Sequence, residues 1–496
     1  MSRPANPILR GMYPDPSVCR VDGTYYLVNS TFEYLPGLPI HASTDLENWR
    51  LVGHAIHDPA QFDFSAVGDS HGMFAPTIRH HDGLFYVACT FMGDGETNFY
   101  VTATDVAGPW SAPVVLPDAR GIDPSLFFHE GRAWWVGCRQ VDDPTFEGET
   151  EVWLRELDLT EGRLVGDERV IWTRTQYRAV WAEGPHLYER DGWFYLVTAE
   201  GGTSFEHSVM VARSKQVDGP YLPCPRNPVL THRHLGHRAD VQNVGHADLF
   251  EGDGDQWWLV ALASRPLDGH HILGRETHVA RVEWEDGWPV VNATLGTLEP
   301  PVVQTGRWGP HGVPTPDDFL SVRGFATFAS VEPDGVLLHS TAAAPGATQP
   351  PAALLRRVTS IDSRIAITLD GIEVDAVAGL ILRQSDDAHV RLELAHGPAD
   401  DALSVRLVVR HGTDDMRASV ELPVGRVTLN ADLTPGGITF GAATASSDPV
   451  ELGQVPLSAL STETAGGFVG TTFGPYVAGP QGSTALLTSW VQEDRS

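Results

Sequence analysis

Three acidic residues, Asp15, Asp123 and Glu183, each stand directly before a proline or glycine at the start of an apolar run. Asp15 lies between Pro14 and Pro16 in "MYPDPSVC", and the other two lie in "GIDPSLFF" and "VWAEGPHLY". Each proline fixes its own φ and restricts the residue before it, so Asp15 is held stiffly at the start of a strand. An Asp-Pro pair can also be simple turn punctuation, and for any one of these acids that alternative stays open.

Glycoside hydrolysis is the chemistry that needs two carboxyl groups with different pKa values. One carboxyl must stay ionised to deprotonate water, and the other must stay protonated to donate to the leaving oxygen. The stiffly held Asp15 suits the base. The longer side chain of Glu183, beside the apolar Trp181 and Ala182, suits an acid with a raised pKa. A third carboxylate, Asp123, would hold the proton of that acid in place.

Five segments align without gaps and indicate how these acids could meet in space. Each begins with a small or polar residue and continues as an apolar strand, a turn of an acidic residue and glycine, and an aromatic strand. Such a turn between two strands is a strong hairpin signal. The first residues of the five segments are Asp15, Ala75, Asp123, Gly184 and His246.

Each repeat offers about four strands, because most hairpins are followed by a second pattern with Trp or Tyr, as in "STDLENWRLVG". Five such units predict a five-bladed β-propeller over residues 1–300. The innermost strands of a propeller surround one axis, so equivalent positions converge at one end of the channel. We therefore expect the first residues of the five segments, with Glu183 one position before Gly184, to face a common site. The alternative is an irregular sandwich with coincidental hairpins.

The composition changes near residue 300. Residues 301–318 are rich in proline and glycine and are interpreted as a linker. Residues 319–496 alternate polar and apolar positions more evenly and contain few aromatic residues, as in "SRIAITLDGIEV". Strands of period two with polar turns predict an antiparallel β-sandwich. The fold class is therefore all-β, a propeller followed by a sandwich.

The charge of the chain limits its partners. The formal net charge of −30 over 496 residues would repel nucleic acids and anionic membranes, and it suits a small neutral or cationic substrate. No run of about 18 apolar residues appears, and the N-terminal "MSRPANPILRG" lacks a secretory pattern. The four cysteines show no CxxC spacing, and three of them lie inside strand-like runs and are interpreted as buried thiols, which favours a cytoplasmic location. A homo-oligomer is left open.

The motifs "YPDPSV", "FAPTIR", "GIDPSLFF", "WAEGPHLY", "GHADLF" and "LGRET" closely resemble those of glycoside hydrolase family 43 over almost the whole propeller. The C-terminal sandwich, with "GGFVGTTFGPYVAG" toward its end, resembles the concanavalin A-like sandwich appended to the β-xylosidases of that family. The resemblance implies an inverting, exo-acting or debranching enzyme on xylan or arabinan. It also implies that Asp15 is the general base, Asp123 the pKa modulator and Glu183 the general acid.

Three substrate-binding positions follow from the same resemblance. Arg275 in "ILGRET" matches an arginine that hydrogen-bonds the sugar near the base; the alternative is a surface salt bridge with Glu276. Phe32 resembles an aromatic wall of the sugar pocket, and core packing is its alternative. Phe74 stands where many relatives have tryptophan, so the width of the pocket and the preferred pentose stay open.

A metal is implied only weakly. His246 in "VGHADLF" matches a histidine that faces a hydrated calcium ion in the channel of many relatives, but calcium prefers oxygen ligands. A satisfied channel histidine near Glu183 is the alternative. We expect that no cofactor is required, and a structural Ca²⁺ in the channel is left open. The cluster of His232, His234 and His237 has no companions suited to zinc and is expected to form a loop beside the site.

The leading functional hypothesis is a β-D-xylosidase that releases xylose from the non-reducing ends of small xylo-oligosaccharides. The alternative within the same chemistry is an α-L-arabinofuranosidase, because β-D-xylopyranose and α-L-arabinofuranose present similar hydroxyl groups. A hypothesis from another class is a carbohydrate-binding propeller without turnover. The presence of all three carboxylates favours catalysis over binding alone.

Overall fold

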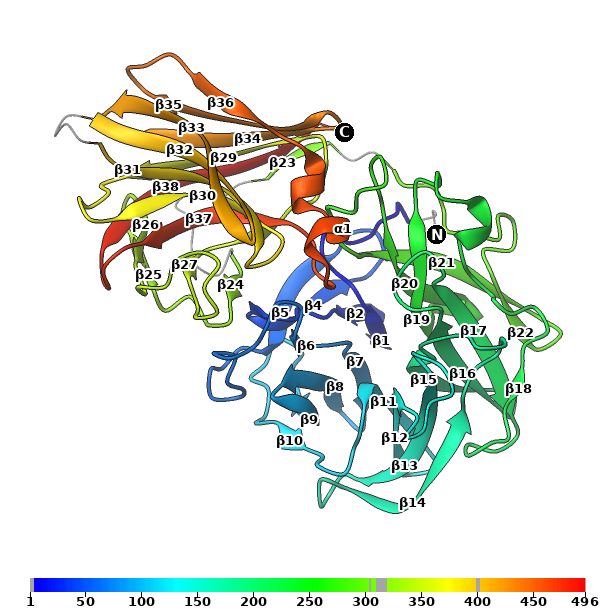
Figure 1. Cartoon of the computed structure of the whole chain (residues 1–496). Coiled ribbons are helices and arrows are strands. Elements are labelled where there is room, and N and C mark those ends of the chain that lie inside the picture. The colour runs from blue at the N-terminus through cyan, green and yellow to red at the C-terminus, as the bar shows by residue number, and fades with distance from the viewer. Residues whose placement is uncertain (1–3, 303–304, 309–318, 398–401, 496) are drawn as a thin grey trace.

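Five sheets stand around one central axis in the computed structural model, which describes residues 4–302, 305–308, 319–397 and 402–495 (Figure 1). Their innermost strands, β1, β7, β11, β15 and β19, contact one another in that order, and β19 closes the ring against β1. Each of these five strands belongs to one of the repeated segments. The predicted five-bladed propeller is confirmed.

All five blades run antiparallel from the axis outward. Blade 1 contains β1 (Ser17–Val21), β2 (Thr24–Val28), β4 (Gly37–Ser43) and β5 (Arg50–Ile56). Blade 2 contains β7 (Thr77–His81), β8 (Leu84–Gly93), β9 (Gly95–Ala103) and β10 (Val114–Val115), with β6 (Gly72–Met73) also paired to β8. Blade 3 contains β11 (Ile122–His129), β12 (Arg132–Gln140), β13 (Thr150–Asp158) and β14 (Arg163–Trp172). Blade 4 contains β15 (Glu183–Arg190), β16 (Trp193–Glu200), β17 (Ser208–Ser214) and β18 (Leu222–Pro223). Blade 5 contains β19 (Gln242–Glu251), β20 (Trp257–Ser264), β21 (Glu276–Glu285) and β22 (Trp288–Val291).

The acidic-Gly turns explain why each segment folds into a hairpin. In blade 1 the turn residues Asp22 and Gly23 have φ of 47° and 81°. The corresponding pairs of blades 2, 3 and 4 also have positive φ at both positions, which is the type I′ geometry that suits the twist of a hairpin. Blade 5 differs, because a 3-10 turn at Asp253–Asp255 lengthens its loop between Glu251 and Trp257.

A buried ion pair ties the inner strands together inside the channel. Asp248 of blade 5 accepts a hydrogen bond of 2.8 Å from Arg79 of blade 2, one of 2.6 Å from Ser17 of blade 1 and one of 2.5 Å from Tyr188 of blade 4. Burial raises the pKa of Asp248, but the charge of Arg79 and the hydrogen bonds from Arg79 and Ser17 outweigh it and hold the pKa below its ordinary value. An ionised Asp248 therefore joins four of the five blades.

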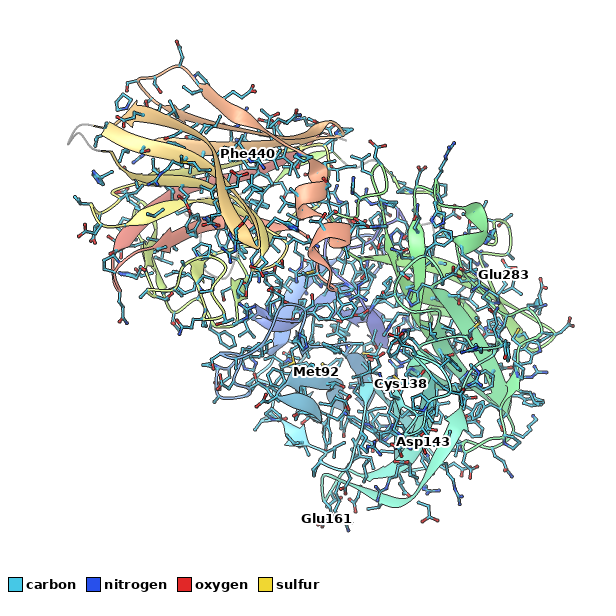
Figure 2. All side chains as sticks on the ribbon, viewed as in Figure 1. Met92, Cys138, Asp143, Glu161, Glu283 and Phe440 are labelled. Carbon is cyan, nitrogen blue, oxygen red and sulfur yellow. The ribbon has the colours of Figure 1, made fainter. Side chains whose placement is uncertain are left out.

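Two antiparallel sheets form the C-terminal sandwich, which lies beside the propeller in Figure 1. The first contains β25 (Ala329–Glu332), β26 (Gly335–His339), β38 (Thr484–Asp494), β29 (Ser363–Asp370), β34 (Val427–Thr434), β35 (Gly437–Thr444) and β36 (Val450–Val455), with β23 (Gly306–Trp308) paired to β38. The second contains β27 (Ala352–Ala353), β37 (Thr472–Ala478), β30 (Val377–Arg383), β31 (Ala388–His396), β32 (Ala402–His411) and β33 (Thr413–Pro423), with β28 (Arg356–Arg357) paired to β37. Phe440, labelled in Figure 2, is buried in the core between the sheets. The predicted sandwich is confirmed.

A small sheet joins the two domains, because β3 (Tyr34–Leu35) of the propeller pairs with β24 (Ser321–Val322). Most of the predicted linker 301–318 lies outside the described residues, and β23 within it pairs with the sandwich. The domain boundaries stay predictions. The helix α1 (Thr462–Ala465) precedes β37.

All four cysteines are buried and free, which confirms the interpretation of the three that lie in strand-like runs. Within the described ranges, no helix is long and apolar enough to cross a membrane.

Candidate active site

The first residues of the repeated segments share an unusual backbone conformation. Asp15, Asp123, Gly184 and His246 have φ of 52°, 54°, 56° and 47°, in the left-handed region. Near the last three, the register with the second strand of the blade is irregular, which is the mark of a β-bulge. Bulges re-aim side chains, and they occur next to active sites. The equivalence inferred from the alignment is therefore visible in the backbone, with Ala75 as the exception.

A pocket of about 280 Å³ lies at this end of the channel. All seven residues that the sequence singled out for catalysis, substrate binding or metal binding line it. They are Asp15, Phe32, Phe74, Asp123, Glu183, His246 and Arg275. The propeller therefore brings the three acids to one cavity. Their individual roles stay predictions.

Asp15 is held as an anion. Its carboxylate accepts a hydrogen bond of 2.9 Å from Arg275 Nη1 and a short one from Ser30 Oγ, and His246 Nδ1 lies 3.9 Å away. Burial raises the pKa of Asp15, but the positive charge of Arg275 and then that of His246 lower it, and the net shift is downward. An ionised carboxylate with ordered donors can accept a proton from water.

Glu183 is shifted in the opposite direction. Burial, followed by the negative charges of Asp123 and Asp15, raises the pKa of Glu183 well above its ordinary value. Burial also raises the pKa of Asp123, whose Oδ2 accepts a hydrogen bond of 3.1 Å from the N–H of Gly184. The site therefore contains one carboxyl that stays ionised and one that keeps its proton, as acid–base chemistry on a glycosidic bond requires.

Arg275 belongs to the site and not to a surface ion pair. Its Nη1 also donates a hydrogen bond of 3.0 Å to Thr203 Oγ1. Glu276 instead pairs with Arg265, at 2.6 Å between Oε2 and Nε. The alternative interpretation of Arg275 as a partner of Glu276 is therefore wrong.

Comparison with protein families agrees with this geometry. Residues 4–289 match the model of glycosyl hydrolases family 43, and residues 318–486 match that of a β-xylosidase C-terminal concanavalin A-like domain. The chain belongs to glycosyl hydrolase family 43. Both parts of the resemblance seen in the sequence are thereby confirmed.

Similar family 43 proteins carry two kinds of name. A xylosidase/arabinosidase of Butyrivibrio fibrisolvens is 50% identical over 298 residues, which cover 59% of this chain and 57% of that protein. A non-reducing end α-L-arabinofuranosidase of Bacteroides ovatus is 35% identical over 96% of this chain and 91% of its own length. The crystal structure of a xylan β-1,4-xylosidase from Bacillus halodurans superimposes with a TM-score of 0.90 at 28% identity, covering 99% of this chain and all of that one.

Three phenylalanines form one wall of the family 43 pocket. Phe468 stacks on Phe32 with ring centroids 5.9 Å apart and meets Phe74 nearly at a right angle at 6.3 Å. Phe32 is 2% exposed, so it packs in the core and lines the pocket at once. Phe468 comes from the sandwich, in the loop between α1 and β37. The sandwich therefore completes the pocket.

Phe468 and Thr203 are among the site residues that escaped the sequence reasoning, as is Ser30, which donates to Asp15. Phe468 lies within the "GGFVGTTFGPYVAG" motif, which identified the sandwich but gave no sign of where its loop would reach. Thr203, in a Gly-rich loop after β16, carries no motif of its own. Both Thr203 and Phe468 contact Arg275 in the folded chain. A contact between such distant segments leaves no pattern in the sequence.

The side chains around His246 do not fit a directly bound calcium ion. A Cβ on Gly184 would lie 2.9 Å from His246 Cε1, so the imidazole packs beside the residue that follows Glu183. Within the described part of the chain, no group of three or more His, Cys, Asp or Glu side chains could hold a metal. Calcium prefers six to eight oxygen ligands, whereas this position offers an imidazole. A hydrated ion in the channel stays a prediction.

The predicted loop histidines have separate environments. His232 is buried, with Nδ1 2.8 Å from the carbonyl of Val241 and Nε2 accepting from the N–H of Leu298. His237 stacks on Phe205 at 3.7 Å, and both line a second cavity that shares Thr203 and Arg275 with the pocket. His234 is exposed in the 3-10 turn Arg233–Leu235, so of the three histidines His237 is the one that lines this cavity beside the site.

Proposed function

We propose that this family 43 member is an inverting exo-β-D-xylosidase that releases D-xylose from the non-reducing ends of xylo-oligosaccharides. The observation that carries the proposal is the opposite pKa shift of two carboxyl groups on one small pocket. The pKa of Asp15 is lowered, and that of Glu183 is raised well above its ordinary value. Glycosidic bond hydrolysis requires two carboxyl groups whose pKa values are shifted in opposite directions in this way.

The proposed reaction uses one water molecule. Asp15 takes a proton from water as the water oxygen attacks the anomeric carbon, and Glu183 gives its proton to the glycosidic oxygen as the carbon–oxygen bond breaks. The released sugar has the inverted anomeric configuration. Asp123 keeps the proton on Glu183 through its negative charge, and Arg275 keeps Asp15 ionised.

The size of the pocket supports exo action. Its volume of about 280 Å³ lies just below the usual range for ligand sites, which suits one sugar ring rather than a polymer chain. The three-phenylalanine wall offers apolar surface to a pentose, and the guanidinium of Arg275 can pair with its hydroxyl groups. A pocket of this kind admits the end of an oligosaccharide.

The second candidate function is an α-L-arabinofuranosidase. It is favoured by the Bacteroides ovatus relative of that name, which is similar to this chain along 91% of its own length. The base, the acid and the pocket would serve both sugars in the same way. The two activities differ only in which pentose the pocket accepts.

Parallel kinetics distinguish the two candidates. We expect kcat/KM for 4-nitrophenyl β-D-xylopyranoside to exceed that for 4-nitrophenyl α-L-arabinofuranoside at the same pH. Xylobiose and arabinobiose would repeat the comparison with natural leaving groups. A large excess of the arabinofuranosidase rate on both pairs would reverse the order of the two candidates.

Replacing the acid tests the chemistry itself. Glu183→Gln cannot donate a proton, so it should lose about 10²–10⁴-fold in kcat on xylobiose. The loss on 4-nitrophenyl xyloside should be smaller, because that leaving group needs little protonation. Glu189→Gln is the matched control, since Glu189 lies on the same strand and pairs with His129 at the surface. Equal losses on both substrates would contradict the role of Glu183.

The configuration of the product tests the base. Proton NMR during the first minutes of 4-nitrophenyl β-D-xylopyranoside hydrolysis should show α-xylose before mutarotation mixes the anomers, because this substrate releases a single sugar. If β-xylose appears first, Asp15 does not activate water for direct displacement.

A further inference from the structure

A serine of the propeller binds the sandwich loop that carries Phe468. Ser70 lies between β5 and β6, is 6% exposed, and has a left-handed φ of 59°. Its Oγ accepts a hydrogen bond of 2.9 Å from the backbone N–H of Phe468. A Cβ on the preceding Gly467 would lie 2.3 Å from that Oγ, so the close approach requires glycine. The contact joins residues from different domains at the edge of the pocket.

Ser70 is itself anchored to a buried carboxylate. Its N–H donates a hydrogen bond of 3.0 Å to Glu33 Oε2, and Glu33 is completely buried beside Phe32 in the sequence. The other oxygen of Glu33 accepts a hydrogen bond of 3.2 Å from Arg383 Nη1, at the end of β30 in the sandwich. One carboxylate therefore holds the propeller loop and the sandwich together.

Further charges surround this carboxylate. Asp69, directly before Ser70, pairs with Arg383 and, at 3.1 Å, with Arg323. Asp386 pairs with Arg323 at 2.7 Å and with Arg383 at 2.9 Å. We call this set the interdomain ion cluster; it consists of Glu33, Asp69, Arg323, Arg383 and Asp386. Removing or separating one partner of such a cluster leaves a buried charge uncompensated, which costs free energy. The cluster therefore fixes the position of the Ser70 loop.

The other side of Phe468 leads to the catalytic centre. Its carbonyl accepts hydrogen bonds of 3.4 Å and 3.3 Å from Nε and Nη2 of Arg275. Nη1 of the same guanidinium donates to Asp15. The backbone of Phe468 is therefore held at its N–H by Ser70 and at its carbonyl by Arg275. A continuous path of polar contacts runs from the interdomain ion cluster to the carboxylate of Asp15.

We propose that Ser70 is a positioning residue. It holds Phe468 of the docked sandwich against Phe32 and Phe74 and thereby places this ring in the wall of the sugar pocket. The inference rests on the proposed function, because it assigns Phe468 to the binding of the substrate sugar. Phe468 is 40% exposed and comes from a loop, so stacking alone leaves it free to swing outward. The hydrogen bond that the Phe468 N–H donates to Ser70 Oγ fixes the backbone that carries this ring.

Ser70→Ala removes the acceptor and leaves the fold of the loop intact. We expect KM for 4-nitrophenyl β-D-xylopyranoside to rise about fivefold while kcat changes less than twofold, since Phe468 contacts the bound sugar and not the reacting atoms. Ser65→Ala is the matched control, because Ser65 is exposed on the same loop, donates a hydrogen bond to Asp63 and does not line the pocket. Equal KM values for the two variants would overturn the proposal.

A double-mutant cycle identifies the route of the effect. In a Phe468→Ala background, Ser70→Ala should change KM less than twofold, because the ring that it positions is absent. A full fivefold effect in that background would show that Ser70 acts by another route and would overturn the proposal. Gly467→Ala, which pushes the loop away from Ser70 from the other side, should reproduce the rise in KM and serves if Ser70→Ala does not fold.

Hydrogen exchange tests the anchor without any substrate. The amides of residues 466–470 should exchange at least about threefold faster in Ser70→Ala than in wild type at an equal Tm. Unchanged exchange would overturn the proposal. If wild type hydrolysed neither pentoside, the proposed function would fail, and exchange would still decide whether Ser70 holds the loop.

Discussion

Removing the charge of Arg275 should move the acidic limb of the pH–activity profile. In the folded protein Arg275 Nη1 lies 2.9 Å from Asp15 Oδ1, and its charge lowers the pKa of that carboxyl. Arg275→Met removes the charge but keeps much of the side-chain volume. Asp15 must be ionised to act as the base, so a higher pKa inactivates the enzyme at a higher pH.

The size of the shift follows from the contact that is lost. A hydrogen bond to a charged group contributes about 1.5–3 kcal/mol, and one pKa unit corresponds to about 1.4 kcal/mol. The pKa of Asp15 should therefore rise by about 1–2 units. His246, 3.9 Å away, and the hydrogen bond from Ser30 remain, so the carboxylate keeps part of its stabilisation.

The measurement is kcat/KM for 4-nitrophenyl β-D-xylopyranoside between pH 3 and pH 9, because this ratio reports the pKa values of the free enzyme. The plateau should also fall in Arg275→Met, since Arg275 contacts Thr203 and the carbonyl of Phe468. Arg275→Lys retains a charge and loses the guanidinium fork, so its plateau should fall while its acidic limb stays near that of wild type. An acidic limb of Arg275→Met within about 0.3 units of wild type would refute the assignment of Arg275 as the group that keeps Asp15 ionised.

Four further predictions concern the buried carboxylates Asp123 and Asp248 and the buried thiol of Cys19. Asp123→Asn removes a negative charge that raises the pKa of Glu183, so the basic limb of the profile should move to lower pH; an unchanged limb would exclude Asp123 as modulator. Asp248→Asn leaves Arg79 buried without its carboxylate, so urea unfolding should show a loss of about 3–5 kcal/mol. In wild type the pKa of Asp248 is lowered by folding, so its contribution is present above about pH 4 and is lost as the pH falls below that; thermal unfolding between pH 7 and pH 3 measures the loss. Burial raises the pKa of the Cys19 thiol to about 12, so it should react with a thiol reagent only after unfolding, as followed by absorbance in native and denaturing buffer.

The propeller and its carboxylates could be predicted from the sequence because the relevant signals are local and repeated. Each hairpin is encoded by its own acidic-Gly turn, and four of the five adopt the expected geometry. Five copies of one signal fix the position of Asp15, Asp123 and Glu183 relative to the axis without any knowledge of packing. The turn of blade 5 escaped this reasoning, because Gly252 and Gly254 offer two places for the chain to reverse.

The contribution of the sandwich could not be predicted in this way. Phe468 reaches the pocket because two domains dock through Glu33 and Arg383, which are 350 residues apart. No periodicity or motif encodes such a contact, since each partner looks like an ordinary charged residue in its own segment. The choice between Glu276 and Asp15 as partner of Arg275 was open for the same reason, and burial in the folded chain decides it.

The left-handed backbone at Asp15 and Asp123 lowers the stability of the folded chain at two positions whose carboxylates are proposed to act in catalysis. Left-handed φ costs residues other than glycine about 1–2 kcal/mol, and Gly184 occupies the equivalent position of blade 4 without that cost. Glycine at either aspartate would therefore relax the backbone and remove the carboxylate in one step. Selection for thermostability alone would favour this change at the expense of the chemistry proposed above, so a library made for a more robust enzyme should keep both positions constant.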